Sequence, residues 1–535
     1  MSVLKKLAGE TALYGLSSIL GRSISFVLVF LYTAIFQPGQ TAIQIKLYAV
    51  IGLLQIIYTV GLDASYFRFS FRERDKQQDY YNLTMSAMLV TSLILSGLLV
   101  LFAKPLIAFL NYPGQEQFLV WTAGILALDA VVYIPFARLR LEKRVKKFVF
   151  ARVASIVINV GLNFFFLLVC PGIAAGKYLL FLQPLIADFY DPTIGIGYVF
   201  IANLIASAAT YVLLWREVVQ FRFRWDWAVL RRMLDYGYPI MLMGLAGSVN
   251  LLTDRLVLER FLPEGFYPGR TAEDALGIYG NCYKLSIFMS LAIQAFRYAA
   301  DPFFFSRTDD KNAPKVFADV MHWFIIACVL IWIGVSLNLD FIGTFFRKEI
   351  YREGLGVVPI LLLGNLFLGV YYNLSVWFKL TDKTGYGTLI TGIGAVSTLV
   401  LNILLIPVLG YTGSALAFLA SCALMAVICY VLGEKYFPVP YSLVNAVGYI
   451  GSAGLLIYLS SLVQIPNLWL AVPFHLLLFL LYFVCIVVVE RNTLLPKRWR
   501  KPTLATASPT TSTAEKGTDP ASAVGEGSFE DEVIH

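Results

Sequence analysis

The chain has 535 residues, of which 58% are hydrophobic and only 14% are charged, and its formal net charge is +8. Soluble domains are usually about 25% charged, and a soluble fold this apolar could not cover its core with polar surface. The composition therefore excludes a water-soluble enzyme, a wholly disordered chain and a disulfide scaffold. The basic residues gather in short segments between apolar runs, which is typical of membrane proteins and not of nucleic-acid binders.

Apolar segments long enough to cross a bilayer occur along most of the chain. A spanning helix needs about 20 mostly apolar residues, whereas a transmembrane barrel would show short alternating segments. We therefore predict an all-α polytopic membrane protein with about 14 transmembrane helices. The predicted spans are residues 11–36, 45–66, 83–108, 117–137, 148–170, 193–215, 236–258, 276–298, 317–338, 355–378, 387–408, 412–432, 442–464 and 468–489.

The distribution of Lys and Arg among the loops predicts the orientation of these helices. Basic residues cluster in every second loop, with Arg72, Arg144 and Arg222 as examples, and the other loops have fewer or balance them with acids. Because cytoplasmic loops carry the basic excess, both termini are predicted to be cytoplasmic. Residues 493–535 begin basic and continue rich in Ser, Thr, Pro and Gly, which predicts a disordered cytoplasmic tail.

Spans two and eight carry matching polar faces. When Tyr48 is set against Tyr279, polar residues recur in both spans at steps of 4, 4, 3 and 4, which is one helical face. Weaker sequence similarities between other pairs of spans occur in the same order. Together with this match, they indicate that spans 1–6 and 7–12 are parallel repeats. We predict an N-lobe at 1–220, a C-lobe at 221–440 and two extra C-terminal helices at 441–492. The matched residues are Gln55, Thr59, Asp63, Tyr66 and Ser70, and Ser286, Ser290, Gln294, Arg297 and Asp301.

Charged residues inside spans are costly and are therefore the first candidates for a functional site. Arg22 lies in the middle of the first span and shares one helical face with Ser18 and Ser25. Two interpretations stay open: Arg22 lines a cavity, or it pairs structurally with a buried acid such as Asp63. The predicted cavity residues are Arg22, Ser18, Ser25, Gln55, Thr59, Asp63, Lys284, Ser290, Gln294 and Arg297.

Other polar residues within spans are weaker candidates. Asp129 and Arg152 lie in spans four and five, and Asp254 with Arg255 is either a site or only a charge pair at a helix end. The six cysteines and three histidines have no metal-ligand spacing, and no HExxH, P-loop or nucleophile-elbow motif occurs. We therefore predict that the chain is not an enzyme and holds no cofactor. An ion gradient (protons or sodium), the membrane potential or the substrate gradient would supply the energy.

Three stretches resemble one known family of membrane transporters. They are GETALYGLSSILGRSISFVLVFLYTAIF, then LRRMLDYGYPIMLMGLAGSVNLLTDRLVLERF with LGIYGNCYKL, and LNILLIPVLGYTGSALA. Over residues 8–490 the chain resembles the polysaccharide-transporter branch of the multidrug/oligosaccharidyl-lipid/polysaccharide (MOP) exporter superfamily. The resemblance implies two six-helix lobes with alternating access in the cell inner membrane, and fourteen spans match the subgroup with two extra C-terminal helices.

The resemblance also implies a function. Family members include flippases for undecaprenyl-pyrophosphate-linked O-antigen and capsule units, so we expect a lipid-linked oligosaccharide flippase for surface polysaccharide export. Its expected partners are that lipid, the membrane lipids, a polysaccharide polymerase and glycosyltransferases, with no nucleic acid. Cavities in the family are commonly cationic, and Arg22 and Lys284 lie in helices where such residues occur, although Asp63 and Asp129 are expected to offset this charge.

Two other functions remain as alternatives. A drug/cation antiporter of the same superfamily would need a dominant acidic site. A membrane-bound polymerase or glycosyltransferase would show a large outer loop or a cluster of catalytic acids.

Overall fold

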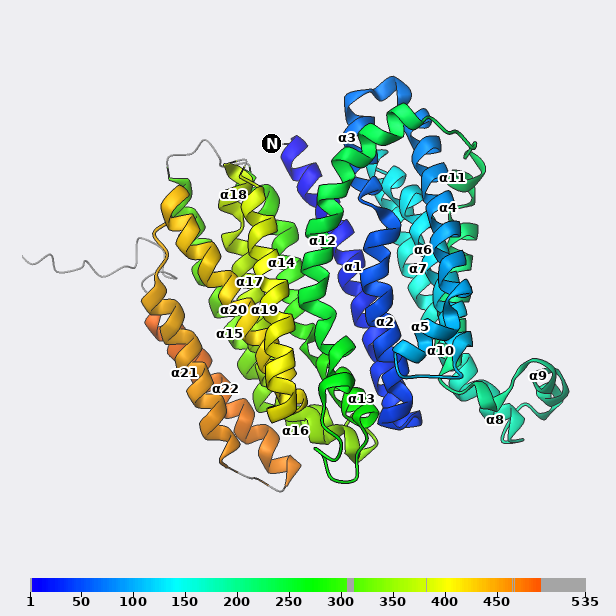
Figure 1. The fold of residues 1–535 in the computed structure, drawn as a ribbon. Helices are drawn as coiled ribbons and strands as arrows, with labels where there is room; N and C mark the ends of the chain where they lie inside the picture. Colours follow the sequence, from blue (N-terminus) through cyan, green and yellow to red (C-terminus); the bar gives the residue numbers. More distant parts are fainter. Residues whose placement is uncertain (1, 306–311, 382, 464, 466, 492–535) are drawn as a thin grey trace, which may run out of the picture. The chain divides into compact units, whose positions relative to one another are not determined.

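The computed structural model describes residues 2–305, 312–381, 383–463, 465 and 467–491, except for the side chains of residues 2–18, 299, 301, 302 and 305. The predicted tail and the side chains of Ser18 and Asp301 therefore lie outside the described residues. Every regular element in the described ranges is a helix, which confirms the all-α class (Figure 1). The chain divides into a compact unit, Met1–Leu480, and a second unit, Leu481–His535.

The first half of the chain forms eleven α-helices in its described residues. A five-residue π-helix, Phe165–Val169, follows α7 directly. The connection from α8 to α10 contains only short helices, and it extends beyond the ends of α7 and α10 (Figure 1). The helices are α1 (Ser2–Ile35), α2 (Pro38–Thr59), α3 (Leu62–Arg72), α4 (Gln77–Leu101), α5 (Ala103–Phe109), α6 (Glu116–Leu141), α7 (Val145–Phe164), α8 (Cys170–Ala174), α9 (Gln183–Phe189), α10 (Gly197–Leu213) and α11 (Trp215–Val219).

The second half contributes eleven more α-helices within the described ranges. A 3-10 turn, η5 (Lys284–Ser286), separates α13 from α14, and a longer one, η6 (Glu349–Val357), precedes α17. The helices are α12 (Trp227–Phe261), α13 (Ala272–Tyr283), α14 (Ile287–Phe305), α15 (Ala313–Leu337), α16 (Leu339–Gly343), α17 (Val358–Leu374), α18 (Val376–Leu380), α19 (Gly385–Leu409), α20 (Tyr411–Tyr436), α21 (Leu443–Ser461) and α22 (Leu468–Val489).

Helices coincide with all fourteen predicted spans, but the count of fourteen is not confirmed. In the described part of the chain, eleven helical segments are long and apolar enough to cross a membrane. The first and sixth predicted spans appear as shorter apolar helices, Ile19–Ile35 and Gly197–Leu213. The eighth is divided between α13 and α14 by the 3-10 turn. A multi-pass membrane protein follows, because a helix satisfies its own backbone hydrogen bonds in lipid.

The pattern of neighbouring helices occurs twice. In the first half α1 packs on α7, α4 on α6, and α10 on both α6 and α7. In the second half α12 packs on α19, α15 on α17, and α20 on both α17 and α19. Contacts between the halves also correspond, because α1 lies along α14 while α12 lies along α2 and α3. These corresponding neighbours agree with a parallel repeat, and the lobe boundaries at residues 220 and 440 stay a prediction.

The two halves approach closely where α2 and α13 begin. Pro38 starts α2 at a position where its missing N–H costs nothing, and Thr271 caps α13 in a capping box with Asp274. Asp274 also accepts a hydrogen bond of 2.9 Å from the backbone N–H of Gly39. A Cβ on Gly277 would collide with the carbonyl oxygen of Pro38, so α13 packs directly against the α2 backbone. We call this the Pro38 end.

A second close approach lies where α3 begins. Val60 and Gly61 have positive φ angles of 47° and 67°, and they separate α2 from α3. A Cβ on Gly61 would collide with the backbone carbonyl of Gly237 in α12. The Ser65 hydroxyl donates a 2.6 Å hydrogen bond to the carbonyl oxygen of Met233 in the same helix. We call this the Gly61 end, and together the two ends fix how α2 and α3 run along α12.

Candidate functional site

A cavity of about 940 Å³ lies among helices of both halves. The first half lines it with α1, α2, α6, α7 and α10, and the second half with α12, α13, η5, α14 and α17. Its polar and charged lining residues are Arg22, Ser25, Tyr32, Gln44, Tyr48, Asp129, Arg152, Ser155, Asn159, Asn203, Ser207, Arg255, Tyr283, Lys284, Ser286, Ser290, Gln294, Arg297, Asn365 and Tyr372.

The charge of this cavity is strongly positive. Among its described lining residues five are cationic and one, Asp129, is acidic. The acid Asp63, expected to offset the positive charge, is not in the lining. Cations within a low-dielectric region attract anions far more strongly than they would in water. The five cationic residues are Arg22, Arg152, Arg255, Lys284 and Arg297.

Arg22 projects from α1 together with Ser25, and both residues line the cavity. No described carboxylate forms an ion pair with Arg22, and in particular Asp63 does not. Arg22 lies within electrostatic range of the Tyr372 hydroxyl on α17. The guanidinium of Arg22 therefore faces the cavity without a described protein counter-charge.

The polar face of α14 lines the same cavity. Ser290, Gln294 and Arg297 of α14 contribute to the lining together with Ser286 of η5, and the spacing of span eight predicted this shared face. The guanidinium carbon of Arg297 lies 4.2 Å from the centre of the Tyr372 ring, a cation–π contact between α14 and α17.

Lys284 and Arg255 form a second pair of cavity cations. The Lys284 ammonium donates a 3.2 Å hydrogen bond to Asn281 Oδ1. The Arg255 guanidinium lies 3.7 Å from the centre of the Tyr283 ring. Its Nε is 3.8 Å from the carboxylate of Asp254, which also accepts a 2.6 Å hydrogen bond from Tyr279. Asp254 therefore neutralises only part of the positive charge on Arg255.

Three predicted cavity residues lie elsewhere. Gln55, Thr59 and Asp63 are absent from the cavity lining. Thr59 is buried and donates a 3.1 Å hydrogen bond to the carbonyl oxygen of Ile56 in its own helix. The polar face of span two does not continue as one stripe, because α2 ends at Thr59 and the left-handed Val60 turns the chain before α3. Only the start of α2 reaches the cavity, with Gln44 and Tyr48.

A wall of amides and hydroxyls was not predicted from the sequence. Asn159 donates a 3.1 Å hydrogen bond to Asn203, whose amide donates a 3.0 Å bond to the Tyr48 hydroxyl. The spacing of Arg152, Ser155 and Asn159 on α7 is one helical face and could have indicated this wall. The sequence left Asp254 with Arg255 open between a site and a charge pair at a helix end, and the place of Arg255 inside a span is a signal of the same kind as that of Arg22.

A buried ion pair joins the halves at the Pro38 end. The Lys46 ammonium on α2 lies 2.8 Å from the Glu259 carboxylate on α12, and both side chains are at most 4% exposed. Lys46 also donates a 2.9 Å hydrogen bond to the Leu110 carbonyl oxygen. The Tyr112 hydroxyl donates a 3.1 Å bond to Glu259, and burial together with the Glu259 charge raises the pKa of Tyr112. The ion pair is therefore hydrogen-bonded on several sides.

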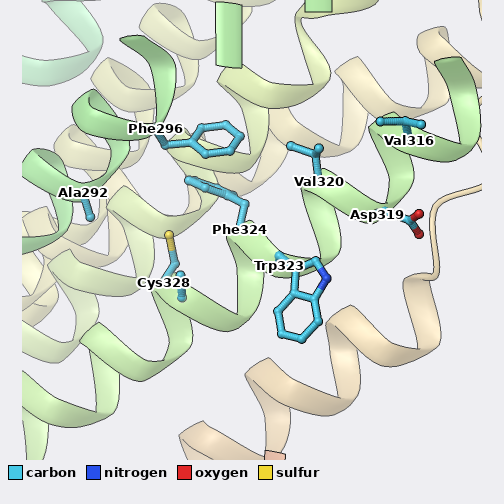
Figure 2. A pocket seen from close by; sticks show the side chains of 9 residues that line it. Ala292, Phe296, Val316, Asp319, Val320, Trp323, Phe324 and Cys328 are labelled. Atoms are coloured by element: carbon cyan, nitrogen blue, oxygen red, sulfur yellow. The ribbon is translucent and has the colours of Figure 1, made fainter. Parts of the chain in front are cut away.

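A smaller pocket between α14 and α15 has a different character. Its volume is about 390 Å³, and apart from Asp319 its lining is apolar (Figure 2). Phe296 and Phe324 pack against each other in its lining, with ring centres 4.4 Å apart (Figure 2). The described residues also contain no group of three or more His, Cys, Asp or Glu that could hold a metal ion. The large cavity is therefore the candidate site.

The fold is shared with solved transporters. The chain is similar to the lipid II flippase MurJ in its inward closed conformation, with a TM-score of 0.70, 13% identity, and coverage of 90% of this chain and 99% of that one. It is also similar to an inward-facing multidrug resistance MATE family transporter of the MOP superfamily, with a TM-score of 0.60, 13% identity, and coverage of 77% and 94%. A MATE in the straight conformation gives a TM-score of 0.51 at 13% identity, over 80% and 94%.

The family follows from the sequence. The model of the family described as polysaccharide biosynthesis protein matches residues 7–308, more than half of the chain. No curated protein matches the chain. Both the family and the fold are those of transporters rather than enzymes. The chain belongs to the polysaccharide biosynthesis protein family, a family of membrane transporters in the MOP exporter superfamily.

Proposed function

We propose that this protein is a flippase that moves a lipid-linked oligosaccharide across the cell inner membrane for surface polysaccharide export. The substrate would be an undecaprenyl-pyrophosphate-linked glycan, carried from the inner to the outer leaflet by alternating access. The proposal assigns no chemical step to the protein, only binding and a change of conformation. Glycosyltransferases would supply the substrate and a polysaccharide polymerase would consume it.

The observation that carries the proposal is the charge of the cavity. Five cationic residues against one carboxylate in the described lining favour an anionic ligand, because charges within membrane spans are usually paired with opposite charges. Guanidinium groups, with five donors each, suit the oxygens of a pyrophosphate. Tyr32, Tyr48 and the amides of Asn159 and Asn203 leave part of the same cavity suited to uncharged polar groups.

A drug/cation antiporter is the second candidate, since MATE transporters share the fold. Such a protein would bind organic cations at an acidic site. The only acid among the described lining residues is Asp129, and five cations surround the same space. The charge balance therefore favours the flippase.

Transport by the purified protein in liposomes tests the proposal. We expect the protein to move a fluorescent undecaprenyl-pyrophosphate-linked sugar between leaflets, measured as its accessibility to a membrane-impermeant quencher. We also expect no movement of a fluorescent cationic dye down an imposed proton or sodium gradient. Transport of the dye without movement of the lipid would contradict the flippase and favour the antiporter.

A further inference from the structure

We propose that the wall formed by α2, α6, α7 and α10 is a carbohydrate subsite, with Tyr48, Asn203 and Asp129 as its recognition groups. This inference rests on the proposed function. It assigns the sugar and the pyrophosphate of the substrate to different parts of the cavity lining. The rest of the lining, which includes Arg22, Arg255, Lys284 and Arg297 from α1, α12, η5 and α14, would hold the pyrophosphate. The sugar next to the pyrophosphate would then lie against the first wall.

A chain of hydrogen bonds holds this wall in place. The Tyr32 hydroxyl donates a 2.8 Å bond to Asn163 Oδ1, and the Asn163 amide donates 2.9 Å bonds to the backbone and side-chain oxygens of Asn159. Asn159 in turn donates to Asn203, which donates to the Tyr48 hydroxyl. Since Asn163 is fully buried, the network is anchored in the protein interior and ends at the cavity.

The network leaves hydrogen-bonding capacity directed at the cavity. The Tyr48 oxygen accepts from Asn203, and the described part of the chain offers no acceptor for the Tyr48 hydroxyl hydrogen. Asn203 uses one of its two amide hydrogens in the described bonds. The Asp129 carboxylate lies near Ser207 and offers acceptor lone pairs at the cavity. This combination of hydrogen-bond donors and acceptors suits the hydroxyl groups of a sugar, because each hydroxyl both donates and accepts hydrogen bonds.

A separate observation also indicates an absent polar ligand. Gln44 lies one helical turn before Tyr48 and lines the same cavity. Its side-chain oxygen is buried and has no hydrogen-bond partner among the described residues, although the residue is only 6% exposed. A buried acceptor without a partner is costly unless a ligand or water satisfies it. A sugar hydroxyl seated on Tyr48 would be in reach of this oxygen.

The charge balance of the wall also fits a neutral ligand. Asp129 and Arg152 are its two charged residues, and they are close enough to interact electrostatically. These two residues have opposite charges, whereas the rest of the described lining contains four cationic residues and no acid. One cavity therefore presents an anion-binding wall and a wall for uncharged polar groups.

Binding measurements with paired lipids test this assignment. The probes are undecaprenyl pyrophosphate and the same lipid carrying one glucose, galactose or N-acetylglucosamine, measured on the purified protein in nanodiscs. We expect at least one sugar-bearing lipid to bind more tightly than the bare lipid. Tyr48→Phe and Asn203→Ala should weaken that sugar-bearing lipid about tenfold, the loss expected for one hydrogen bond. Both variants should leave affinity for the bare lipid within about twofold, a smaller change than the loss of one hydrogen bond.

Matched variants separate the possible outcomes. Tyr58→Phe removes a hydroxyl from the same helix that bonds to Ser96 outside the cavity, so it should change neither affinity. Arg22→Ala should weaken both lipids. If neither lipid binds the wild-type protein, the proposed function fails. If both lipids bind but no sugar improves affinity, or the variants weaken both lipids equally, the carbohydrate subsite fails and the proposed function stands.

Discussion

At the scale of single residues, the cavity gathers positive charges that few carboxylates of the described residues neutralise. Arg22 is the clearest case, because its side chain lines the cavity and no described carboxylate forms an ion pair with it. Asp63, the structural partner considered from the sequence, lies in the first turn of α3 and outside the lining. A bound pyrophosphate would therefore supply the counter-charge that the protein does not.

Arg22→Ala is expected to abolish transport without removing the protein from the membrane. Arg22→Lys should retain part of the activity, because a lysine keeps the charge but loses bidentate geometry. Surface polysaccharide and the amount of membrane protein are measured together in a strain that depends on this gene. Arg216→Ala, which changes an exposed arginine on α11, is the control. Normal polysaccharide with Arg22→Ala would exclude a role in headgroup binding.

At the scale of elements, α2 and α12 carry the contact between the halves. They are joined at the Pro38 end by the buried pair Lys46–Glu259, which Tyr112 and the Leu110 carbonyl complete. Removing one member of such a pair leaves an uncompensated charge, whereas replacing both can be nearly neutral. Comparing the stability of a single variant with that of the double variant therefore measures what the ion pair contributes.

We expect Glu259→Leu to lower the free energy of unfolding by about 3–5 kcal/mol, the usual cost of breaking a buried pair from one side. The double variant Lys46→Met with Glu259→Leu should recover most of that loss. The measurement is thermal unfolding of the purified protein in detergent, with Lys104→Met, which changes an exposed lysine on α5, as the control. A double variant as unstable as the sum of the two single variants would show that the pair does not act as a unit.

The polar faces of spans two and eight lie in different surroundings, which gives another prediction at the scale of elements. Ser290 on α14 lines the cavity, whereas Thr59 at the end of α2 is buried outside it. In a background with the native cysteines replaced, Ser290→Cys should react with a membrane-impermeant thiol reagent in at least one conformation. Thr59→Cys should stay unlabelled, and added lipid substrate should protect Ser290→Cys. Equal labelling of both would mean that the polar face of span two also opens to the cavity.

At the scale of the whole molecule, corresponding helices have corresponding neighbours in the two halves, which indicates that the same helix packing occurs twice. The predicted six spans in each copy would give both copies the same orientation, which parallel repeats require. The basic loops, such as that between α6 and α7, then lie on one side of the membrane. The Pro38 end would lie on the other side.

Reporter fusions test this orientation. A fusion at residue 145, where α7 begins after the basic connection from α6, is expected to report a cytoplasmic location. A fusion at residue 180, in the connection between α8 and α9, is expected to report a periplasmic one. The expectation follows from the excess of Lys and Arg at the cytoplasmic surface. A cytoplasmic signal at residue 180 would overturn the topology.

The sequence by itself determined the helical membrane class and the cavity-lining face of α14. Both depend on local properties: hydropathy over about 20 residues, and the spacing of polar side chains along one helix. It also singled out Arg22 and Lys284, because a charge inside an apolar run is unusual wherever the helix packs. The break between α2 and α3 at Val60 and Gly61 was not visible in that pattern, and Gln55, Thr59 and Asp63, on the predicted polar face of span two, are absent from the cavity lining.

Only the tertiary structure decided which faces converge. Arg22, Arg152, Arg255, Lys284 and Arg297 belong to five different elements, and they line one cavity because α1, α7, α12, η5 and α14 pack around it. The wall of amides and hydroxyls also depends on helix packing. Asn159 on α7 donates a hydrogen bond to Asn203 on α10, and Asn203 donates one to Tyr48 on α2. The periodicity of a helix fixes which residues share a face, but the packing of its neighbours fixes what that face meets.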